Sequence, residues 1–480
     1  MQVSRRMFCG NLAWMLGGTV AAAQGVPAAN AISSAGKPRL KFGVITDMHI
    51  GTPWEMGINS PGTEKALRMF REMDVDAVVM PGDMIDTGSI AQLRELARIW
   101  YEVFPDGKGK DGRNVEKIMV TGNHDVACWT PPEKQSPEKQ IVQRIAELWE
   151  EVLHEHYEPV FRKEVNGIQF VCANWGIYPK KEMADAYRKE DVEPVLREAL
   201  RLAKPGDPVF YVQHAPLPKT CFGSNSQAYG TAATLFGKDE QVFALTGHSH
   251  KPLTHPRSIW QDGFTALHTG VVAWTDFGPF CWPNNLPASA VYAKYAVIIS
   301  VYDNRIVIDR KNVCFDSSLG ETWTVPLPLR KETFPYTAEK LRAKAEAPRF
   351  PTGARVAVNI GMGENVFWTV PPNKNAIQGK GGIVVSFPAA CVTGGDNQVM
   401  YYEVTVTEAA SGKAVTTKKC YTEFYLDRDH ARNTYEYLID AEKDKLPEGV
   451  PCVYTVRPVD FFETKGSAIV SAPIAFRRFL

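Results

Sequence analysis

The sequence lacks an excess of charge of either sign. Its 480 residues include 54 Lys and Arg and 54 Asp and Glu, so the formal net charge is zero. This balance provides no long-range attraction toward nucleic acid or an anionic membrane surface, and we expect no nucleic-acid partner. The nine cysteines form no C-x-x-C pair, which argues against a structural zinc site or a thioredoxin-like motif.

Long hydrophobic runs are also scarce. The apolar stretch NLAWMLGGTVAAA near the N-terminus is shorter than the about 20 residues that a membrane-spanning helix needs. It follows two arginines in SRRMFCG and leads to the small-x-small pattern Ala29-Asn30-Ala31. The arrangement resembles a twin-arginine export signal over residues 1–31, so we expect a periplasmic or otherwise exported protein with no stable membrane anchor. An uncleaved anchor and an incidental basic start are the alternatives.

Strands and helices alternate over the first two thirds of the chain. The spacing of apolar residues predicts helices at Thr63–Met73, Ile90–Val103 and Pro137–Tyr157. Apolar runs predict strands between them, which indicates an α/β core that we place at residues 38–327. Three later runs follow one another without a helix and predict an antiparallel addition: Phe264–Thr269, Tyr295–Val301 and Arg305–Asp309.

The pattern changes in the last third. Residues 328–350 are rich in proline and charge and are interpreted as a linker. Residues 351–480 contain runs of alternating apolar and polar residues between turn signals, which predict an all-β sandwich. Leu446-Pro447 followed by Tyr454 resembles the arrangement of fibronectin type III domains.

Five predicted strands end in residues with carboxylate, imidazole or amide groups. In chain order these are Asp47 and His49; Asp83 and Asp86; Asn123, His124 and Asp125; His214; and His248 and His250. The carboxyl ends of strands form the edge at which α/β sheets bind ligands. We therefore expect the groups to meet at one site.

The residue types suit a divalent transition metal. Carboxylate, imidazole and amide ligands favour zinc, manganese or iron, whereas calcium prefers oxygen alone. A glycine precedes three of the candidates and would let the backbone turn without a Cβ in the way: Gly82, Gly122 and Gly247. Singly, each candidate has an ordinary explanation as a turn, cap, loop or surface residue. Their order and common place at strand ends favour a metal site.

The five blocks ITDMHIG, PGDMIDTG, TGNHD, QHAP and TGHSH resemble those of the calcineurin-like metallophosphoesterases. The resemblance implies a four-layer α/β/β/α sandwich around two divalent metal ions, Mn, Zn or Fe. It implies one metal held by Asp47, His49 and His250, another held by Asn123, His214 and His248, and Asp83 bridging both. His124 would face the phosphate and assist the leaving group, with Asp86 orienting it.

The implied activity is hydrolysis of a small-molecule phosphate mono- or diester by a hydroxide bound to both metals. Thr87-Gly88 stands where the protein phosphatases of this family have Arg-Gly, which argues against a protein substrate. Asp86 replaces the tyrosine of purple acid phosphatases, and His214-Ala215-Pro216 replaces the His-His-Pro of many cyclic-nucleotide-type diesterases.

Two further features leave alternatives open. The aromatic segment with Trp274 and Phe277 could form a pocket wall or pack against the C-terminal sandwich. Of the histidines outside the blocks, His268 lies on a predicted strand near the site.

The alternative to an enzyme is a non-catalytic, metal-stabilised protein that docks a partner or glycan through its β-sandwich. The presence of His124 and Asp86, which a purely structural metal site does not need, favours the enzyme.

Overall fold

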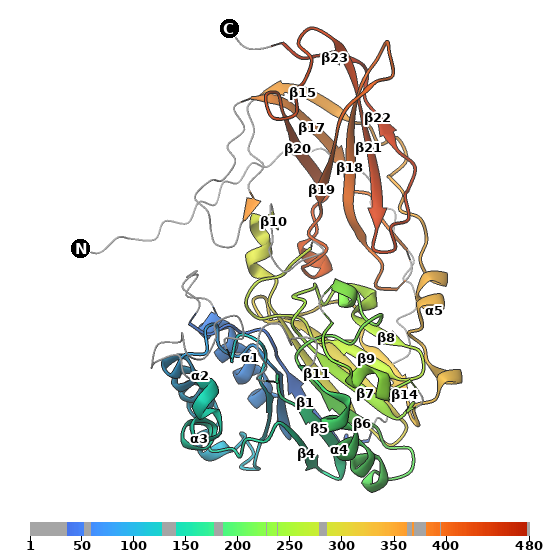
Figure 1. The fold of residues 1–480 in the computed structure, drawn as a ribbon. Helices are drawn as coiled ribbons and strands as arrows, with labels where there is room; N and C mark the ends of the chain where they lie inside the picture. The colour runs from blue at the N-terminus through green and yellow to red at the C-terminus, as the bar shows by residue number, and fades with distance from the viewer. Residues whose placement is uncertain are drawn as a thin grey trace, which may run out of the picture. The chain divides into compact units, whose positions relative to one another are not determined.

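Two β-sheets pack face to face in the part of the chain that holds the candidate site (Figure 1). The structure is a computed structural model that describes residues 36–51, 59–126, 141–176, 186–226, 228–237, 239–277, 286–361, 367–368, 381–393 and 395–477. The expected export signal lies outside these ranges.

The first sheet combines a parallel half with an antiparallel half. Its parallel strands are β1 (Leu40–Val44), β2 (Ala77–Pro81) and β3 (Glu116–Val120). Its antiparallel strands are β11 (Tyr295–Val301), β12 (Arg305–Asn312), β13 (Ser317–Ser318) and β14 (Trp323–Pro326). The antiparallel addition predicted for the runs at residues 295 and 305 is therefore present.

The second sheet contains β4 (Val160–Val165), β5 (Ile168–Ala173), β6 (Val209–Val212), β7 (Val242–Thr246), β9 (Thr265–His268) and β8 (Ile259–Gln261), in that order. Strand β9 pairs parallel with β7 and antiparallel with β8. The prediction that the run at residues 264–269 belongs to the antiparallel addition is therefore wrong. The segment between β7 and β9 makes the crossover without an α-helix, using η7 (Pro256–Ser258) and β8.

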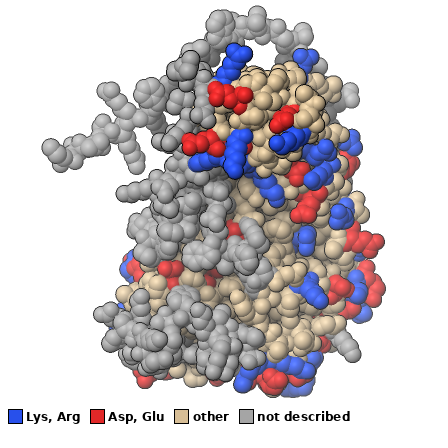
Figure 2. All heavy atoms as spheres, turned by 45° about the horizontal axis from the view of Figure 1, so that its top comes forward, with Lys and Arg blue, Asp and Glu red and all other residues tan. Residues whose placement is uncertain are grey.

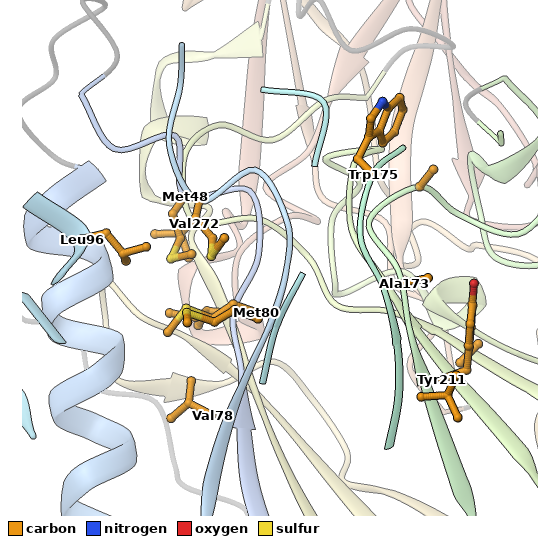
Figure 3. Close-up of a cluster of buried hydrophobic side chains, with 14 of the residues drawn as sticks. Met48, Val78, Met80, Leu96, Ala173, Trp175, Tyr211 and Val272 are labelled. Atoms are coloured by element: carbon orange, nitrogen blue, oxygen red, sulfur yellow. The ribbon is translucent and has the colours of Figure 1, made fainter. Parts of the chain in front are cut away.

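The side chains of each strand point alternately into two hydrophobic layers. Phe42 on β1 meets Phe170 and Phe210 of the second sheet at ring distances of 5.4 and 5.0 Å, which places these rings between the sheets. The opposite face of β2 carries Val78 and Met80, which share a core with the helices (Figure 3). Because strand side chains alternate, each strand contributes to both layers.

Helices cover the outer faces of both sheets (Figure 1). Helices α1 (Asn59–Glu72), α2 (Ile90–Val103) and α3 (Ile141–Leu153) belong to the first sheet's layer, and α4 (Lys189–Leu202) packs on β5. This gives the α/β/β/α sandwich that the sequence predicts. Helix α3 ends at Leu153 rather than at the predicted Tyr157, because His154 adopts a left-handed φ of 53°.

The C-terminal region is all β. One sheet contains β15 (Ala357–Gly361), β17 (Gly382–Pro388) and β20 (Thr434–Asp440). The other contains β19 (Ala414–Tyr421), β18 (Val399–Glu408), β21 (Pro451–Asp460), β22 (Ile469–Val470) and β23 (Ile474–Ala475). Leu446 and Tyr454 are buried in the core that the two sheets share. The region is sandwich-like, and its fibronectin type III identity stays a prediction.

Shorter elements complete the described chain. They are a pair of two-residue strands, β10 (Leu286–Pro287) and β16 (Phe367–Trp368), the helix α5 (Ala338–Ala343), and the 3₁₀ turns η1 (Pro105–Gly107), η5 (Ser224–Ser226), η6 (Ala232–Leu235), η8 (Ala288–Tyr292), η9 (Lys331–Thr333) and η10 (Arg428–His430). No helix among the described residues is both long and apolar enough to cross a bilayer. The six cysteines that the structure describes are all unpaired.

Charged side chains of both signs are interspersed on the described surface that Figure 2 shows. This distribution agrees with the even balance of the sequence. The charges that matter for the site are the buried ones, which lie at the strand ends and are described next.

Candidate metal centre

The turns after β1, β2 and β7 adopt an unusual backbone conformation. Five residues in these turns have left-handed φ values, namely Asp47 (52°), His49 (45°), Asp83 (46°), His248 (68°) and His250 (52°). Such a conformation costs a non-glycine residue on the order of 1–3 kcal/mol. Strain of this kind, repeated at five polar residues, indicates that these turns are shaped to aim side chains.

Hydrogen bonds between the turns hold two of them side by side. The amide of Asp47 donates to the carbonyl of Gly82 at 3.2 Å, and the amide of His49 donates to the carbonyl of Asp83 at 3.0 Å. A third link joins Ile50 to Ile85 as a parallel bridge. The pairing of β1 with β2 therefore continues beyond the strands and carries both sets of polar side chains to the same place.

The first compact group consists of Asp47, His49 and His250. One nitrogen or oxygen from each lies within 4.8 Å of the others, and all three residues are buried. His250 Nε2 is 3.1 Å from Asp47 Oδ1 and 3.2 Å from His49 Nε2. These atoms face one another closely enough to bind one cation.

The second compact group consists of Asp83, His214 and His248, again within 4.8 Å and buried. His214 Nε2 is 3.0 Å from Asp83 Oδ2 and 3.2 Å from His248 Nδ1. Asp83 Oδ2 also lies 3.7 Å from His49 Nε2 in the first group. Asp83 therefore stands between the two groups.

Asn123 belongs to neither group by contact, but its side chain is informative. Its Oδ1 atom is buried and has no hydrogen-bond partner in the structure. The next residue, His124, donates its backbone amide to Asp83 Oδ1 at 2.8 Å, so the turn lies beside the second group. An unsatisfied buried oxygen is costly, and a cation would satisfy it.

The ring orientations of three histidines favour metal binding. His250 Nδ1 donates to the carbonyl of Trp274 and His214 Nδ1 donates to the carbonyl of Pro81, both at 2.7 Å. His49 Nδ1 lies 3.1 Å from the carboxylate of Asp86. A carbonyl or carboxylate accepts only, so these Nδ1 atoms carry protons and the Nε2 atoms point into the site. The Nε2 atoms of His49 and His250 face each other at 3.2 Å, and a cation placed between them would bind both.

His124 and Asp86 form a third group with His49. His124 Nδ1 donates to the backbone carbonyl of Asp86 at 2.7 Å and lies 3.5 Å from its carboxylate. The carboxylate itself is nearer to His49, at 3.1 Å. Asp86 therefore contacts His124 mainly through its backbone and His49 through its side chain. The His124 side chain is 25% exposed, the most open of these residues.

The buried charges set the protonation of the site. Burial, with His124 nearby, lowers the pKa of His49 to about 4, so His49 is neutral at pH 7. Burial opposes a charge on His214, but Asp83 and Asp47 outweigh it and raise the pKa of His214 to about 9. Burial works against ionised Asp83 too, yet His214 and His124 hold its pKa well below the ordinary value. Without metal, a proton on His214 thus balances the carboxylates, and a bound cation would displace it.

Asp125 joins the two loops on either side of the site. It accepts hydrogen bonds from the amides of Ile85, at 2.9 Å, and Gly122, at 2.7 Å. Burial and the charge of Asp83 raise the pKa of Asp125 to about 7. Its role is therefore to shape the turn, as its place in TGNHD suggests.

Metal-free protein is expected to lose stability in mild acid. Burial lowers the pKa of His248 and of His268 to about 3, that of His49 to about 4, and that of His255 well below its ordinary value. Below pH about 6.5 the unfolded chain protonates these rings and the folded chain does not, so the free energy of unfolding falls as the pH drops. The pKa of Asp125 is raised to about 7, so the folded chain binds this one proton before the unfolded chain does, and Asp125 opposes the trend. Urea denaturation of chelator-treated protein at pH 6.5 and pH 4.5 measures the effect, and equal or greater stability at pH 4.5 would contradict it.

Glycine is required where the turns meet. A Cβ added to Gly122 would lie 2.2 Å from Asp83 Oδ1, and one added to Gly247 would lie 2.5 Å from Asp47 Oδ2. The reason inferred from the sequence for these glycines therefore agrees with the space around them.

Gly122→Ala is expected to displace Asp83 and to weaken metal binding at least about 10-fold, the size of effect seen when the support of a ligand is disturbed. Gly237→Ala is the matched control, because nothing lies within 4 Å of its added Cβ. Titration of each purified variant with Mn²⁺ gives the comparison. Equal affinity in the two variants would show that Asp83 does not take part in binding.

Sequence reasoning missed an aromatic wall beside the second group. The Trp175 ring lies 5.8 Å from that of His248 and 6.1 Å from that of His214, and Tyr229 lies 5.6 Å from His248. Trp175 follows the end of β5, as the candidate ligands follow their strands, but an aromatic residue is not the polar signal used there. The hydroxyl of Tyr187 also accepts hydrogen bonds from the amides of His214 and Ala215, at 3.2 and 3.3 Å.

The two named residues of the aromatic segment make different contacts. The Trp274 ring lies 4.4 Å from His49 and 4.7 Å from His250, so it lines the first group. Phe277 instead packs on the C-terminal region. His268 is buried on β9, its Nδ1 accepts from the amide of Gly270, and it belongs to none of the three groups.

An α/β/β/α fold with buried imidazole and carboxylate groups at its strand ends is typical of a metal-dependent hydrolase. Residues 40–252 match the family model described as calcineurin-like phosphoesterase. Among curated proteins, no relative matches the chain.

Several solved structures resemble this one. A dimetal phosphatase from Danio rerio is 13% identical, with a TM-score of 0.38, over 60% of this chain and 99% of that one. A predicted phosphoesterase from Streptococcus pneumoniae TIGR4 is 13% identical, with a TM-score of 0.28, over 60% and 97%. GAP50, the anchor in the inner membrane complex of Plasmodium, is 15% identical, with a TM-score of 0.37, over 61% and 89%.

The family match and the site together identify residues 40–252 as a calcineurin-like metallophosphoesterase domain. This match and the buried His/Asp site of the dimetal type support a hydrolase that acts on phosphoric esters.

Proposed function

We propose that the protein hydrolyses a small-molecule phosphate mono- or diester with two divalent metal ions, Mn, Zn or Fe. Asp47, His49 and His250 would hold one ion, Asn123, His214 and His248 the other, and Asp83 both. When bound, two such ions would neutralise the charge of the phosphoester and lower the pKa of a water molecule that attacks phosphorus.

The observation that carries this proposal is the crowding of ligand atoms at the strand ends. The Nε2 atoms of His49 and His250 face each other at 3.2 Å, while their Nδ1 atoms are engaged elsewhere, and His250 Nε2 also lies 3.1 Å from Asp47 Oδ1. Asn123 Oδ1 is buried without a partner. A divalent cation in each group would bind these inward-facing atoms.

His124 would give a proton to the leaving-group oxygen. Its Nδ1 is fixed by the carbonyl of Asp86, so Nε2 is the atom directed at the substrate. Burial opposes a charge on His124, but Asp83 and Asp86 outweigh it and raise its pKa to about 9 in the metal-free protein. The ring is therefore protonated at pH 7 in the metal-free protein, and a protonated ring is what a leaving alkoxide requires.

We also propose the wider organisation of the chain. Residues 1–31 would direct export, so that the enzyme acts in the periplasm or another exported location, and the two arginines with Ala29-Asn30-Ala31 support this. Residues 38–327 would form the catalytic domain, 328–350 the linker and 351–480 a fibronectin type III-like domain. The change from α/β to all-β order supports the division.

A metal-removal assay tests the proposed function. Chelated protein is expected to be inactive on aryl phosphate mono- and diesters and to regain activity with Mn²⁺, Zn²⁺ or Fe²⁺ at two ions per chain. A panel covering both ester classes determines which class is preferred. Full inactivity with two bound metals would favour the alternative, a metal-stabilised binding protein that docks a partner or glycan.

A further inference from the structure

One short segment holds the first metal-binding group in place. His250 Nδ1 donates to the carbonyl of Trp274 at 2.7 Å, and the backbone carbonyl of His250 accepts from Thr275 Oγ1 at 3.0 Å and from the amide of Asp276 at 2.8 Å. The amide of Ala273 also donates to the carbonyl of Asp47 at 2.9 Å. Residues 272–277, here called the bracing segment, thus fix the ring of His250 from the side chain and from the backbone.

The bracing segment ends in a contact with the C-terminal region. The Phe277 ring lies 4.8 Å from Phe424, 4.8 Å from Tyr425 and 5.4 Å from Tyr421. Phe277, Phe424 and Tyr425 are 6%, 2% and 0% exposed, so this is a closed hydrophobic contact. The hydroxyl of Tyr295 on β11 adds a hydrogen bond to the carbonyl of Tyr425 at 2.7 Å.

A buried ion pair also holds the C-terminal region against the α/β part. Asp396 accepts from Arg310 Nη2 at 2.7 Å and from Trp323 Nε1 at 2.6 Å, and all three side chains are buried. The Arg310 guanidinium also lies 3.7 Å from the Trp323 ring. A buried charge pair with additional hydrogen bonds loses several kcal/mol when one partner moves away, which disfavours sliding at this interface.

We propose that the C-terminal β region positions His250 through Phe277, and is therefore a structural part of one metal site rather than an independent appendage. The proposal rests on the proposed function, because it assigns His250 to a metal. Phe424 and Tyr425 contact Phe277, and the bracing segment, which ends at Phe277, contacts His250. Phe277, Phe424 and Tyr425 are positioning residues, since none of them touches the site.

The second metal site has a different support. His214 Nδ1 is held by Pro81 at the end of β2, and Asp83 by the amide of His124, all within the α/β part. The coupling is thus asymmetric: a disturbance at Phe277 should affect the ion held by Asp47, His49 and His250 and spare the other. This asymmetry separates positioning from a general loss of stability.

The test uses two matched substitutions in the full chain. Phe424→Leu removes part of the contact with Phe277, whereas Phe461→Leu makes the same change in a buried ring that contacts His255 and Phe424 instead. Metal-free protein is titrated with Co²⁺, whose absorption spectrum reports histidine coordination. Phe424→Leu is expected to weaken one of the two binding steps by about 10-fold, the lower end for a supporting residue. Phe461→Leu is expected to leave both steps unchanged.

Hydrogen exchange of residues 272–277 in the metal-free variants is the second readout. Faster exchange in Phe424→Leu than in Phe461→Leu supports the proposal without any metal, and so separates its failure from failure of the proposed function. If Phe424→Leu does not fold, Phe277→Leu is measured in its place. Unchanged binding and exchange in the variants, or equal weakening of both metal steps, would overturn the proposal.

Discussion

Asp83→Asn is expected to abolish metal binding and hydrolysis together. Asp83 Oδ2 lies 3.0 Å from His214 Nε2 in one group and 3.7 Å from His49 Nε2 in the other. An amide keeps one oxygen but removes the charge, so both sites lose their common ligand. The loss of kcat/KM should exceed the about 10²–10⁴-fold expected for loss of an acid catalyst.

Metal analysis of the purified variant decides whether the cause is the metal. Asp303→Asn is the matched control, because Asp303 is 91% exposed, lies in the turn between β11 and β12, and belongs to none of the three groups at the site. The control should keep two ions and full activity, and both variants should show the same circular dichroism spectrum. A variant at Asp83 that retains two ions would contradict the bridging role.

His124→Ala is expected to lower kcat by about 10²–10⁴-fold while leaving metal content unchanged. The reason is that His124 contacts Asp83 and Asp86 but lies in neither of the two three-residue groups assigned to the metals. Its loss therefore removes a proton donor and spares the ligands.

The dependence on the leaving group distinguishes an acid catalyst from a phosphate-binding residue. Nitrophenyl phosphates have stable leaving groups and should lose little, whereas alkyl phosphates should lose most of their rate. His156→Ala provides the control, because His156 is 75% exposed. An equal loss on both classes of substrate would contradict proton donation and indicate that His124 binds the phosphate.

Most of the α/β fold could be predicted from the sequence because its strands and helices have strong periodic patterns. The predicted helix at Ile90–Val103 and the predicted strand at Tyr295–Val301 have the observed bounds. The pairing of β9 could not be predicted, because an apolar run does not show whether a strand pairs parallel, as β9 does with β7, or antiparallel, as it does with β8. The end of α3 depends on the left-handed turn at His154, which the pattern does not encode.

The residues of the site were predicted from a single rule, which is that polar groups follow strands. The rule identifies Asp47, His49 and His250 as candidates, and the resemblance to the calcineurin-like family assigns all three to one ion. Asp47 and His49 follow β1 in one sheet and His250 follows β7 in the other, so their meeting depends on how the two sheets pack. It does not predict Trp175, since an aromatic residue after a strand is usually core. Nor does it predict which atom of Asp86 contacts His124, because that depends on the turn geometry.

The contact between Phe277 and the C-terminal region was one of two interpretations left open by the sequence. Aromatic residues serve equally well as pocket walls and as interface residues, so composition cannot separate the two roles. The structure places Trp274 against His250 of the first group and Phe277 against the C-terminal region, within four residues. This proximity is what links the C-terminal region to the metal centre.

Anomalous X-ray diffraction from crystals soaked in Mn²⁺ tests the central claim most directly. The predicted result is two peaks per chain on either side of Asp83, one among Asp47, His49 and His250 and the other among Asn123, His214 and His248. Peaks elsewhere, or none at these groups, would contradict the account.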